Sequence, residues 1–136
     1  YPDGKKVTPH VLEPTFGLSR LMTILLMDAY REEDVDGSQR VFLQLPFDLA
    51  PVKYAILPLI KKPELIEVAD KIYKKLSEKY NCEVHLSGSI GKRYRKQDEI
   101  GTPYCVTVDF DSLEDGCVTI RNRDTLKQER VSIDEL

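Results

Sequence analysis

YAILPLI, residues 54–60, is the stretch on which the fold of this chain depends. A short, continuous apolar run of this kind is typical of a strand that is buried on both faces. Pro63 follows it at the start of a helix predicted over residues 64–80, which has apolar residues on one face and lysines in its C-terminal half. A buried strand followed by an amphipathic helix indicates an α/β domain.

The alternation continues toward the C-terminus. Further elements are predicted in the order strand, loop, short polar helix, three strands and the start of a truncated helix: residues 82–86, 87–91, 92–100, 104–110, 117–123, 127–133 and 134–136. The order β-α-β-α-β-β-β predicts a mixed β-sheet flanked by helices over residues 52–136.

A smaller piece precedes this domain. Within residues 1–35, a turn at 2–4 and an extended stretch at 9–15 lead into an apolar helix predicted over 18–30, which ends in solvent at charged residues 31–34. Such a piece cannot enclose a core, so it must pack on the rest of the chain or on something outside it. Residues 36–51 are predicted to be a linker, with a polar stretch at 36–40, a short hydrophobic stretch at 41–45 and a proline-bounded segment at 46–51.

Composition excludes several classes of protein. The chain has 136 residues, a net charge of −3, 41% hydrophobic and 32% charged residues, which is the balance of a folded domain. No apolar run approaches the ~18–20 residues of a membrane span, and no secretory signal is present in the printed sequence. A net charge of −3 does not exclude nucleic-acid binding, because a domain binds with one face.

The cysteines and methionines carry two further expectations. The chain has three cysteines without CxxC spacing, and His10 and His85 are the only possible histidine co-ligands in the sequence. We therefore expect neither a metal site nor a disulfide framework, and the cysteines fit a reducing, cytoplasmic location. The first residue is Tyr1, and both methionines, Met22 and Met27, lie inside the chain, so the chain is predicted to be a fragment.

The densest functional pattern is GKRYRKQDEIGTP, residues 91–103. Four cations on little more than one helical turn can bind phosphates, an interleaved aromatic ring can stack on a base, and carboxylates can accept hydrogen bonds from base amino groups. The residues in question are Lys92, Arg93, Tyr94, Arg95, Lys96, Asp98 and Glu99. A solvated helix with internal Arg–Glu pairs explains the same spacing equally well.

Polar residues of the neighbouring strands are predicted to share one face of the sheet with this helix: Thr107, Asp109, Thr119, Arg121 and Arg123. Residues 87–91 could hold an anion at a helix N-terminus, although a Gly-Ser loop is more often a turn. No catalytic triad or Walker loop is present in the sequence. In the first piece, Glu13 and Arg20 form either a structural ion pair or a substrate site, and the residues alone do not decide between these alternatives.

These segments together resemble glycyl-tRNA synthetases of the dimeric class II type. EPTFGLSRLMTILL, residues 13–26, is similar to motif 3 of the class II catalytic domain in its glycine-specific form. Residues 50–59, 91–111 and 118–136 are similar to the anticodon-binding domain that the glycine, histidine, threonine and proline enzymes share. The resemblance covers nearly the whole chain.

The resemblance implies roles for four residues of the first piece. Arg20 would be the catalytic arginine that neutralises the tail of ATP during attack on the α-phosphorus, and Gly17 would leave room for the adenine. Glu13 would bind the α-ammonium of glycine. Thr15 would lie beside the substrate, where a serine is common, and its methyl group would shrink the pocket. ATP with Mg and glycine are the implied substrates of the parent enzyme.

The resemblance also implies an RNA partner, the anticodon stem-loop of tRNA-Gly. Arg93, Tyr94, Asp98, Glu99, Arg121 and Arg123 are predicted to read it, and Lys92, Arg95 and Lys96 to contact its phosphates; Asp98 and Asp124 alternatively hold the domain together. The parent is expected to be a homodimer. Motifs 1 and 2 have no counterpart in these residues, so the chain alone is predicted to be inactive. A non-catalytic nucleic-acid-binding accessory protein is the alternative.

Overall fold

The structure is a computed structural model, which describes residues 3–35 and 37–136. Tyr1, Pro2 and Asp36, and with them part of the predicted turn and the start of the predicted linker, lie outside the described residues. The elements are α1 (Leu18–Ala29), β1 (Tyr30–Val35), β2 (Ser38–Leu43), η1 (Phe47–Leu49), β3 (Tyr54–Pro58), α2 (Pro63–Ser77), β4 (Cys82–Val84), α3 (Ile90–Ile100), β5 (Tyr104–Val108), α4 (Asp111–Asp115), β6 (Cys117–Asn122), β7 (Gln128–Ser132) and η2 (Ile133–Glu135).

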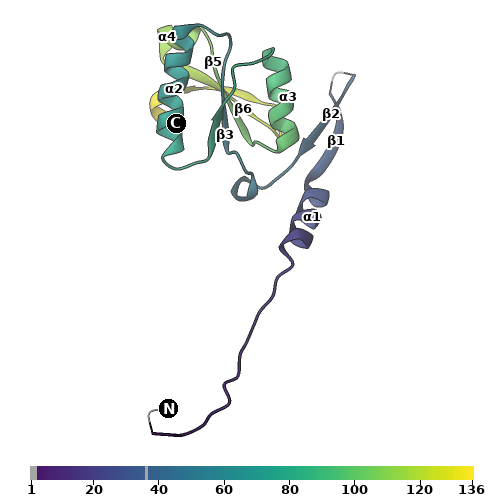
Figure 1. Ribbon diagram of the computed structural model, residues 1–136. Coiled ribbons are helices and arrows are strands. Elements are labelled where there is room, and N and C mark those ends of the chain that lie inside the picture. The colour runs from purple at the N-terminus through teal and green to yellow at the C-terminus, as the bar shows by residue number, and fades with distance from the viewer. Residues whose placement is uncertain (1–2, 36) are drawn as a thin grey trace.

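Five strands form one mixed sheet in the order β4-β3-β5-β6-β7. The first three are parallel, whereas β5–β6 and β6–β7 are antiparallel. Helix α2 covers one face and α3 covers the other (Figure 1). The predicted α/β architecture, a mixed sheet flanked by helices, is confirmed.

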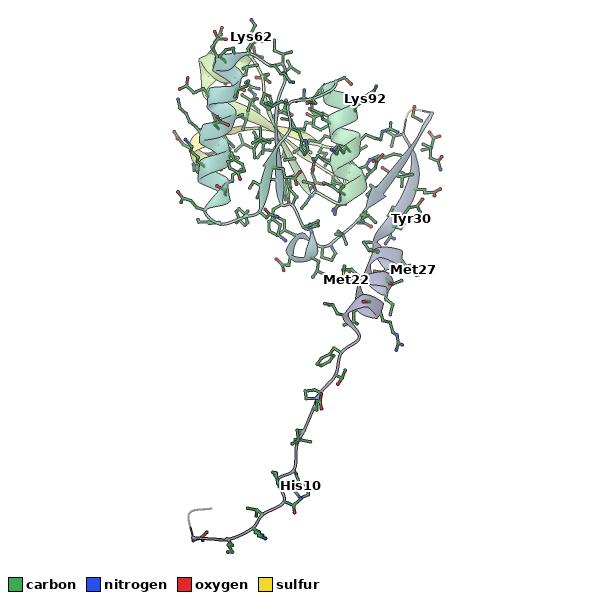
Figure 2. The ribbon with its side chains drawn as sticks, in the orientation of Figure 1. His10, Met22, Met27, Tyr30, Lys62 and Lys92 are labelled. Carbon is green, nitrogen blue, oxygen red and sulfur yellow. The ribbon has the colours of Figure 1, made fainter. Side chains whose placement is uncertain are left out.

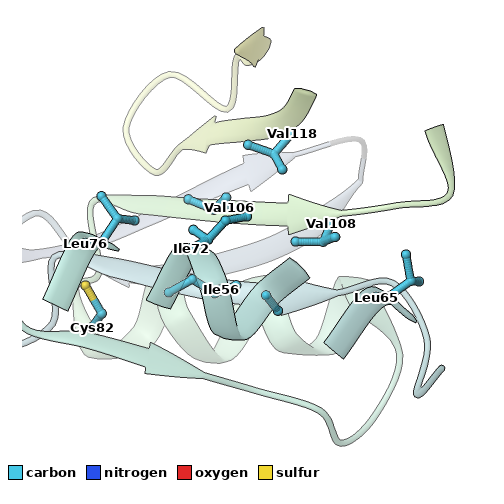
Figure 3. Packing of buried hydrophobic residues seen from close by; sticks show 9 residues of the cluster. Ile56, Leu65, Ile72, Leu76, Cys82, Val106, Val108 and Val118 are labelled. Carbon is cyan, nitrogen blue, oxygen red and sulfur yellow. The ribbon is translucent and has the colours of Figure 1, made fainter. Parts of the chain in front are cut away.

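The main core lies between α2 and the sheet (Figure 3). Pro63 occupies the first turn of α2, where its missing N–H costs nothing, and Lys74 and Lys75 complement the dipole in the last turn. The buried face of the helix packs on alternate residues of the strands: Leu65, Ala69, Ile72 and Leu76 against Ile56, Val106, Val108 and Val118. This periodicity is what the sequence predicted for the helix, and the burial of β3 on both faces is what its continuous apolar run predicted.

The opposite face of the sheet is buried as well. Ala55, Leu57 and Cys105 pack against Ile90 and Tyr94 of α3. The face of β5 and β6 that was predicted to be a polar surface beside the basic helix is therefore covered by that helix, and buried polar residues on it bond to α3.

Residues 30–43 correct the sequence prediction. Instead of a helix ending in solvent followed by a polar linker, they form an antiparallel hairpin of β1 and β2, hereafter the hairpin. Gly37 has a φ of +75°, which suits the turn between the strands. Residues 36–51 contain β2 and η1, and Phe42, Leu45 and Ala50 are buried, so this segment packs on the domain and is not a free linker.

The N-terminal part lies apart from the sheet domain. The predicted extended stretch at 9–15 has no strand partner among the described residues, and residues 5–17 lead away from the domain (Figures 1 and 2). Helix α1 buries Ala29, while Met22 and Met27 are exposed. Within residues 3–35 and 37–136, no helix has the length and apolarity to cross a membrane.

Candidate nucleic-acid interface

Helix α3 carries the exposed cations of the candidate site. Lys92, Arg95 and Lys96 are exposed and together are called the basic ridge; Lys92 lies near the N-terminal end of the helix (Figure 2). The first turn of α3 contains no acidic residue. Because the N-terminus of a helix carries partial positive charge, cations there are unfavourable unless an anion binds.

The two lysines of the basic ridge have no ion-pair partner in the described part of the chain. Their i,i+4 spacing places like charges next to each other, which costs stability in a helix. The internal Arg–Glu pairs of the alternative interpretation are also absent from these residues, since Arg95 donates instead to the carbonyl oxygen of Gln39, 2.7 Å away. The two lysines therefore lower the stability of α3, because they repel each other and Lys92 opposes the helix dipole.

Two hollows border the basic ridge. One, of about 440 Å³, is lined by Gly91, Lys92, Arg95, Lys96 and Glu99. The other, of about 320 Å³, is lined by His85, Ser87, Gly88, Lys92, Arg93 and Lys96. The loop at residues 87–91, which the sequence offered as an anion site or a turn, thus contributes to the second hollow. No cluster of potential metal ligands occurs in residues 3–35 and 37–136.

Tyr94 and Glu99 differ in their surroundings. Tyr94 is half-buried, its hydroxyl is hydrogen-bonded to Thr107 Oγ1, and burial is the main cause of its raised pKa. The guanidinium of Arg121 lies 4.8 Å from the centre of its ring, so this face of the ring is occupied. Glu99 is exposed and lines the same hollow as the three cations of the basic ridge.

Arg93 is an interior residue. Its Nη1 donates to the carbonyl oxygens of Pro58 and His85 at 2.6 and 2.9 Å, and Nη2 donates to that of Leu59 at 3.0 Å. Burial lowers its pKa. The sequence predicted that Arg93 reads RNA, but the structure places its guanidinium over the ends of β3 and β4, where it joins α3 to the sheet.

Asp98, Arg121 and Arg123 are also interior residues, with 1%, 7% and 2% of their surface exposed. Both carboxylate oxygens of Asp98 accept from Arg121 at 2.8 Å, and this pairing outweighs burial to raise the pKa of Arg121. Arg123 donates to the carbonyl oxygens of Gly101 and Leu45 and pairs with Asp124. These groups hold the domain together, the alternative that the sequence left open for Asp98 and Asp124.

Arg40 of β2 is a member of the same interior network that sequence reasoning missed. It is 3% exposed, and its Nε donates to Asp98 Oδ2 at 2.9 Å. We call Arg40, Arg121, Arg123 and Asp98 the arginine cluster. A period-2 signal could have found it, because Arg40 and Phe42 share the buried face of β2 and the guanidinium lies 4.1 Å from the Phe42 ring centre.

The predicted substrate residues of the first piece are not brought together with the basic ridge. Glu13, Thr15, Gly17 and Arg20 are all exposed, and within residues 3–35 and 37–136 no hydrogen bond or ion pair joins Glu13 to Arg20. Gly17 has a φ of −79°, and an added Cβ there would meet Arg20 Cβ at an ordinary 3.6 Å. The local fold therefore does not require glycine at this position.

Known proteins match both the sheet domain and the chain as a whole. The family described as "Anticodon binding domain" matches residues 53–136. Glycine--tRNA ligase of Corynebacterium efficiens is 54% identical over 138 residues, which cover 98% of this chain and 30% of that protein. Glycine--tRNA ligase of Acetivibrio thermocellus is 56% identical over 134 residues, which cover 98% and 29%. The chain thus spans less than a third of the length of these curated relatives.

Solved structures agree on the fold. The RNA binding domain of threonyl-tRNA synthetase from Cryptosporidium parvum superposes with a TM-score of 0.61 at 25% identity, covering 68% of this chain and 23% of that one. Prolyl-tRNA synthetase from the same organism, complexed with L-proline and AMP, gives 0.66 at 22% identity, covering 69% and 21%. The predicted resemblance to glycyl-tRNA synthetases is confirmed, and the chain belongs to the anticodon-binding-domain family.

Proposed function

We propose that this chain is the part of a glycine–tRNA ligase that binds the anticodon stem-loop of tRNA-Gly, and that the basic ridge contacts the phosphates of the loop. The observation that carries the proposal is the pair of exposed lysines without an ion-pair partner among the described residues: Lys92 in the first turn of α3 and Lys96 one turn further along the same face. No carboxylate of the described residues pairs with either lysine, whereas an RNA backbone would supply anions to both, and at Lys92 the helix dipole also favours an anion.

The other residues of the predicted RNA surface take different parts. Glu99 is the residue we propose to read a base, since an exposed carboxylate can accept from the amino group of cytosine. Tyr94 presents only part of its ring. Arg93, Asp98, Arg121 and Arg123 act indirectly, because they fix α3 on the sheet and thereby set where the basic ridge lies.

For the whole protein we propose synthesis of glycyl-tRNA in the cytoplasm by a homodimer, with ATP, Mg and glycine as substrates. Arg20 then serves as the catalytic cation, Glu13 as the ligand of the glycine ammonium, Thr15 as a wall of the pocket and Gly17 as the adenine contact. The exposure of all four residues, together with a glycine that the local fold does not need, supports a role outside the sheet domain. The accessory-protein alternative is not favoured by the relatives.

The RNA contact is tested by measuring the affinity for a glycine anticodon stem-loop and for a scrambled loop at two salt concentrations. Lys92→Ala/Lys96→Ala should weaken both and reduce the salt slope by about 0.7 for each phosphate that the protein no longer neutralises. The matched control is Lys74→Ala/Lys79→Ala on the other face of the sheet. Equal effects of the two double variants would contradict the proposal.

Base reading needs a separate variant. Glu99→Gln removes the charge at nearly constant volume, so we expect it to reduce the preference for the glycine anticodon over the scrambled loop while leaving the salt slope intact. An unchanged preference would move base reading away from Glu99. Activity is tested independently by glycine-dependent exchange of pyrophosphate with ATP, which we expect this chain alone not to support.

A further inference from the structure

Arg40 connects two parts of the chain that are distant in sequence. Its guanidinium donates to Asp98 of α3, to the carbonyl oxygen of Arg123 at 2.6 Å, and to Glu33 of its own hairpin. The side chain is almost completely buried, so its bonds to Asp98 and to the Arg123 carbonyl are shielded from water. One residue therefore joins the hairpin to both the helix and the strand end that frame the RNA-facing side.

The hairpin also supports the basic ridge directly. Arg95 donates to the carbonyl oxygen of Gln39, the neighbour of Arg40 in β2. Figure 1 shows the hairpin alongside α3 and continuous with α1. Any movement of the hairpin would therefore displace the anchor of one member of the basic ridge.

Asp98 forms ion pairs with two arginines that come from different parts of the chain. Arg121 comes from β6 and binds Asp98 within the sheet domain, whereas Arg40 brings in the hairpin. Removal of either arginine leaves the buried carboxylate with one cationic partner. The two positions thus form a natural pair for comparison, because the local electrostatic change is similar but only one of them holds the hairpin.

We propose that Arg40 is a positioning residue that fixes the hairpin rigidly on α3, so that α1 and the basic ridge keep one mutual orientation. As far as it concerns RNA, this inference rests on the proposed function. The attachment of the hairpin through Arg40, hereafter the joint, does not rest on it, since the joint consists of hydrogen bonds within the chain. The buried guanidinium supplies geometric specificity, a use of buried ion pairs known from other systems.

The joint is tested by ¹⁵N relaxation of the free chain. In the wild type, amides of the hairpin and of the sheet should report the same rotational correlation time. In Arg40→Met the hairpin amides should show a shorter rotational correlation time than the sheet amides. In Arg121→Met the two correlation times should remain equal. A loss of thermal stability is expected in both variants and does not separate them, but the motion of the hairpin does.

A second, more conservative variant keeps the experiment decisive if Arg40→Met does not fold. Arg40→Lys keeps the charge, but a single amine cannot reproduce the fork that reaches Asp98 and the Arg123 carbonyl together, so its hairpin is also expected to move. Wild-type relaxation in every folded Arg40 variant would overturn the proposal. So would independent hairpin motion in the unmodified chain.

The RNA arm uses the glycine anticodon stem-loop. Arg40→Met should weaken binding by about threefold to tenfold, because the side chains of the basic ridge that the hairpin no longer holds in place must be ordered on binding. Unchanged affinity in a variant with a mobile hairpin would overturn the link between the joint and RNA binding. If the wild type does not bind the stem-loop, the proposed function fails, and the relaxation experiment still decides whether Arg40 fixes the hairpin.

Discussion

Arg93 shows how a cation in a basic run can belong to the interior. Its three carbonyl acceptors come from Pro58, Leu59 and His85, at the C-terminal ends of β3 and β4. Arg93→Met should therefore lower the free energy of unfolding by about 2–4 kcal/mol, because the carbonyls lose their donor in a buried setting. Denaturant unfolding measures this change.

Arg95→Met is the control for that prediction. Arg95 lies two positions further along the same helix and is exposed, so its loss should change the stability by less than about 1 kcal/mol. Similar losses in both variants would mean that the carbonyl contacts of Arg93 do not stabilise the fold.

Arg130 pairs with two carboxylates and thereby makes part of the stability of the fold depend on pH. It pairs with Asp109 at 3.1 Å and Asp115 at 2.9 Å. Burial alone would raise the pKa of Asp109, but hydrogen bonds from Arg130 and Ser112 outweigh it and lower the pKa. The hydrogen bond from Arg130 likewise lowers the pKa of Asp115.

The lowered pKa values set the direction of a pH effect. The stabilisation is present above the ordinary aspartate pKa of about 4 and is lost as the pH falls through the lower folded values. Arg130→Met should therefore reduce the melting temperature at pH 7, and the difference from the wild type should shrink as the pH falls below about 4. Thermal unfolding at a series of pH values measures it. A difference that grows on acidification would contradict this account.

At the scale of elements, the end of α3 is fixed by a close approach to the hairpin. Gly101 has a φ of +85°, and an added Cβ would lie 2.8 Å from Leu45 Cδ1 and 3.1 Å from the Leu43 carbonyl oxygen. Gly101→Ala should cost about 2–3 kcal/mol, since it combines backbone strain with a clash. Gly116→Ala is the control, because Gly116 has a φ of +65° but nothing within 4 Å. Its cost should be near 1 kcal/mol. Urea titrations of both variants test the difference.

The elements also show how far sequence reasoning reaches. Helix α2 was predictable because its one periodic apolar face meets the core, and Pro63 marks its start. Strand β3 was predictable because its apolar run is continuous, and it is buried on both faces. The hairpin was not predictable in the same way. Its sequence, from Tyr30 to Leu43, is rich in charge, and the side chain that decides its place is an arginine, Arg40, whose partners lie 58 and 83 residues away.

The basic helix was predictable as an element but not residue by residue. Lys92, Arg93, Arg95 and Lys96 look alike in the sequence, yet Arg93 points inward and the other three outward. A guanidinium can be buried where backbone carbonyls are left open at strand ends, a condition that depends on the sheet and not on the helix. Which cations of α3 face solvent is therefore decided by tertiary packing.

For the whole molecule, the question is where the independently stable unit begins. Helix α1 exposes most of its apolar residues, among them Leu18, Leu21, Met22, Ile24 and Met27. Among the described residues, it contributes to the buried clusters through Ala29 and Leu25, which pack with Leu43, Leu45 and Ala50. The hairpin, by contrast, supplies a buried cation to Asp98, and the carbonyl of Leu45 just beyond its end accepts from Arg123. The stable unit should therefore include the hairpin but not most of α1.

Two truncated chains test this boundary. A chain that begins at residue 25 keeps Ala29, the hairpin and the arginine cluster, so its melting temperature should stay within about 2–3 °C of the full chain. A chain that begins at residue 46 leaves Asp98 without Arg40 and Arg123 without the Leu45 carbonyl. Loss of one partner of a buried ion pair costs about 3–5 kcal/mol, which corresponds to a fall of roughly 10 °C or more for a domain of this size. Equal melting temperatures for the two truncated chains would place the boundary at the start of η1 and make the hairpin an appendage.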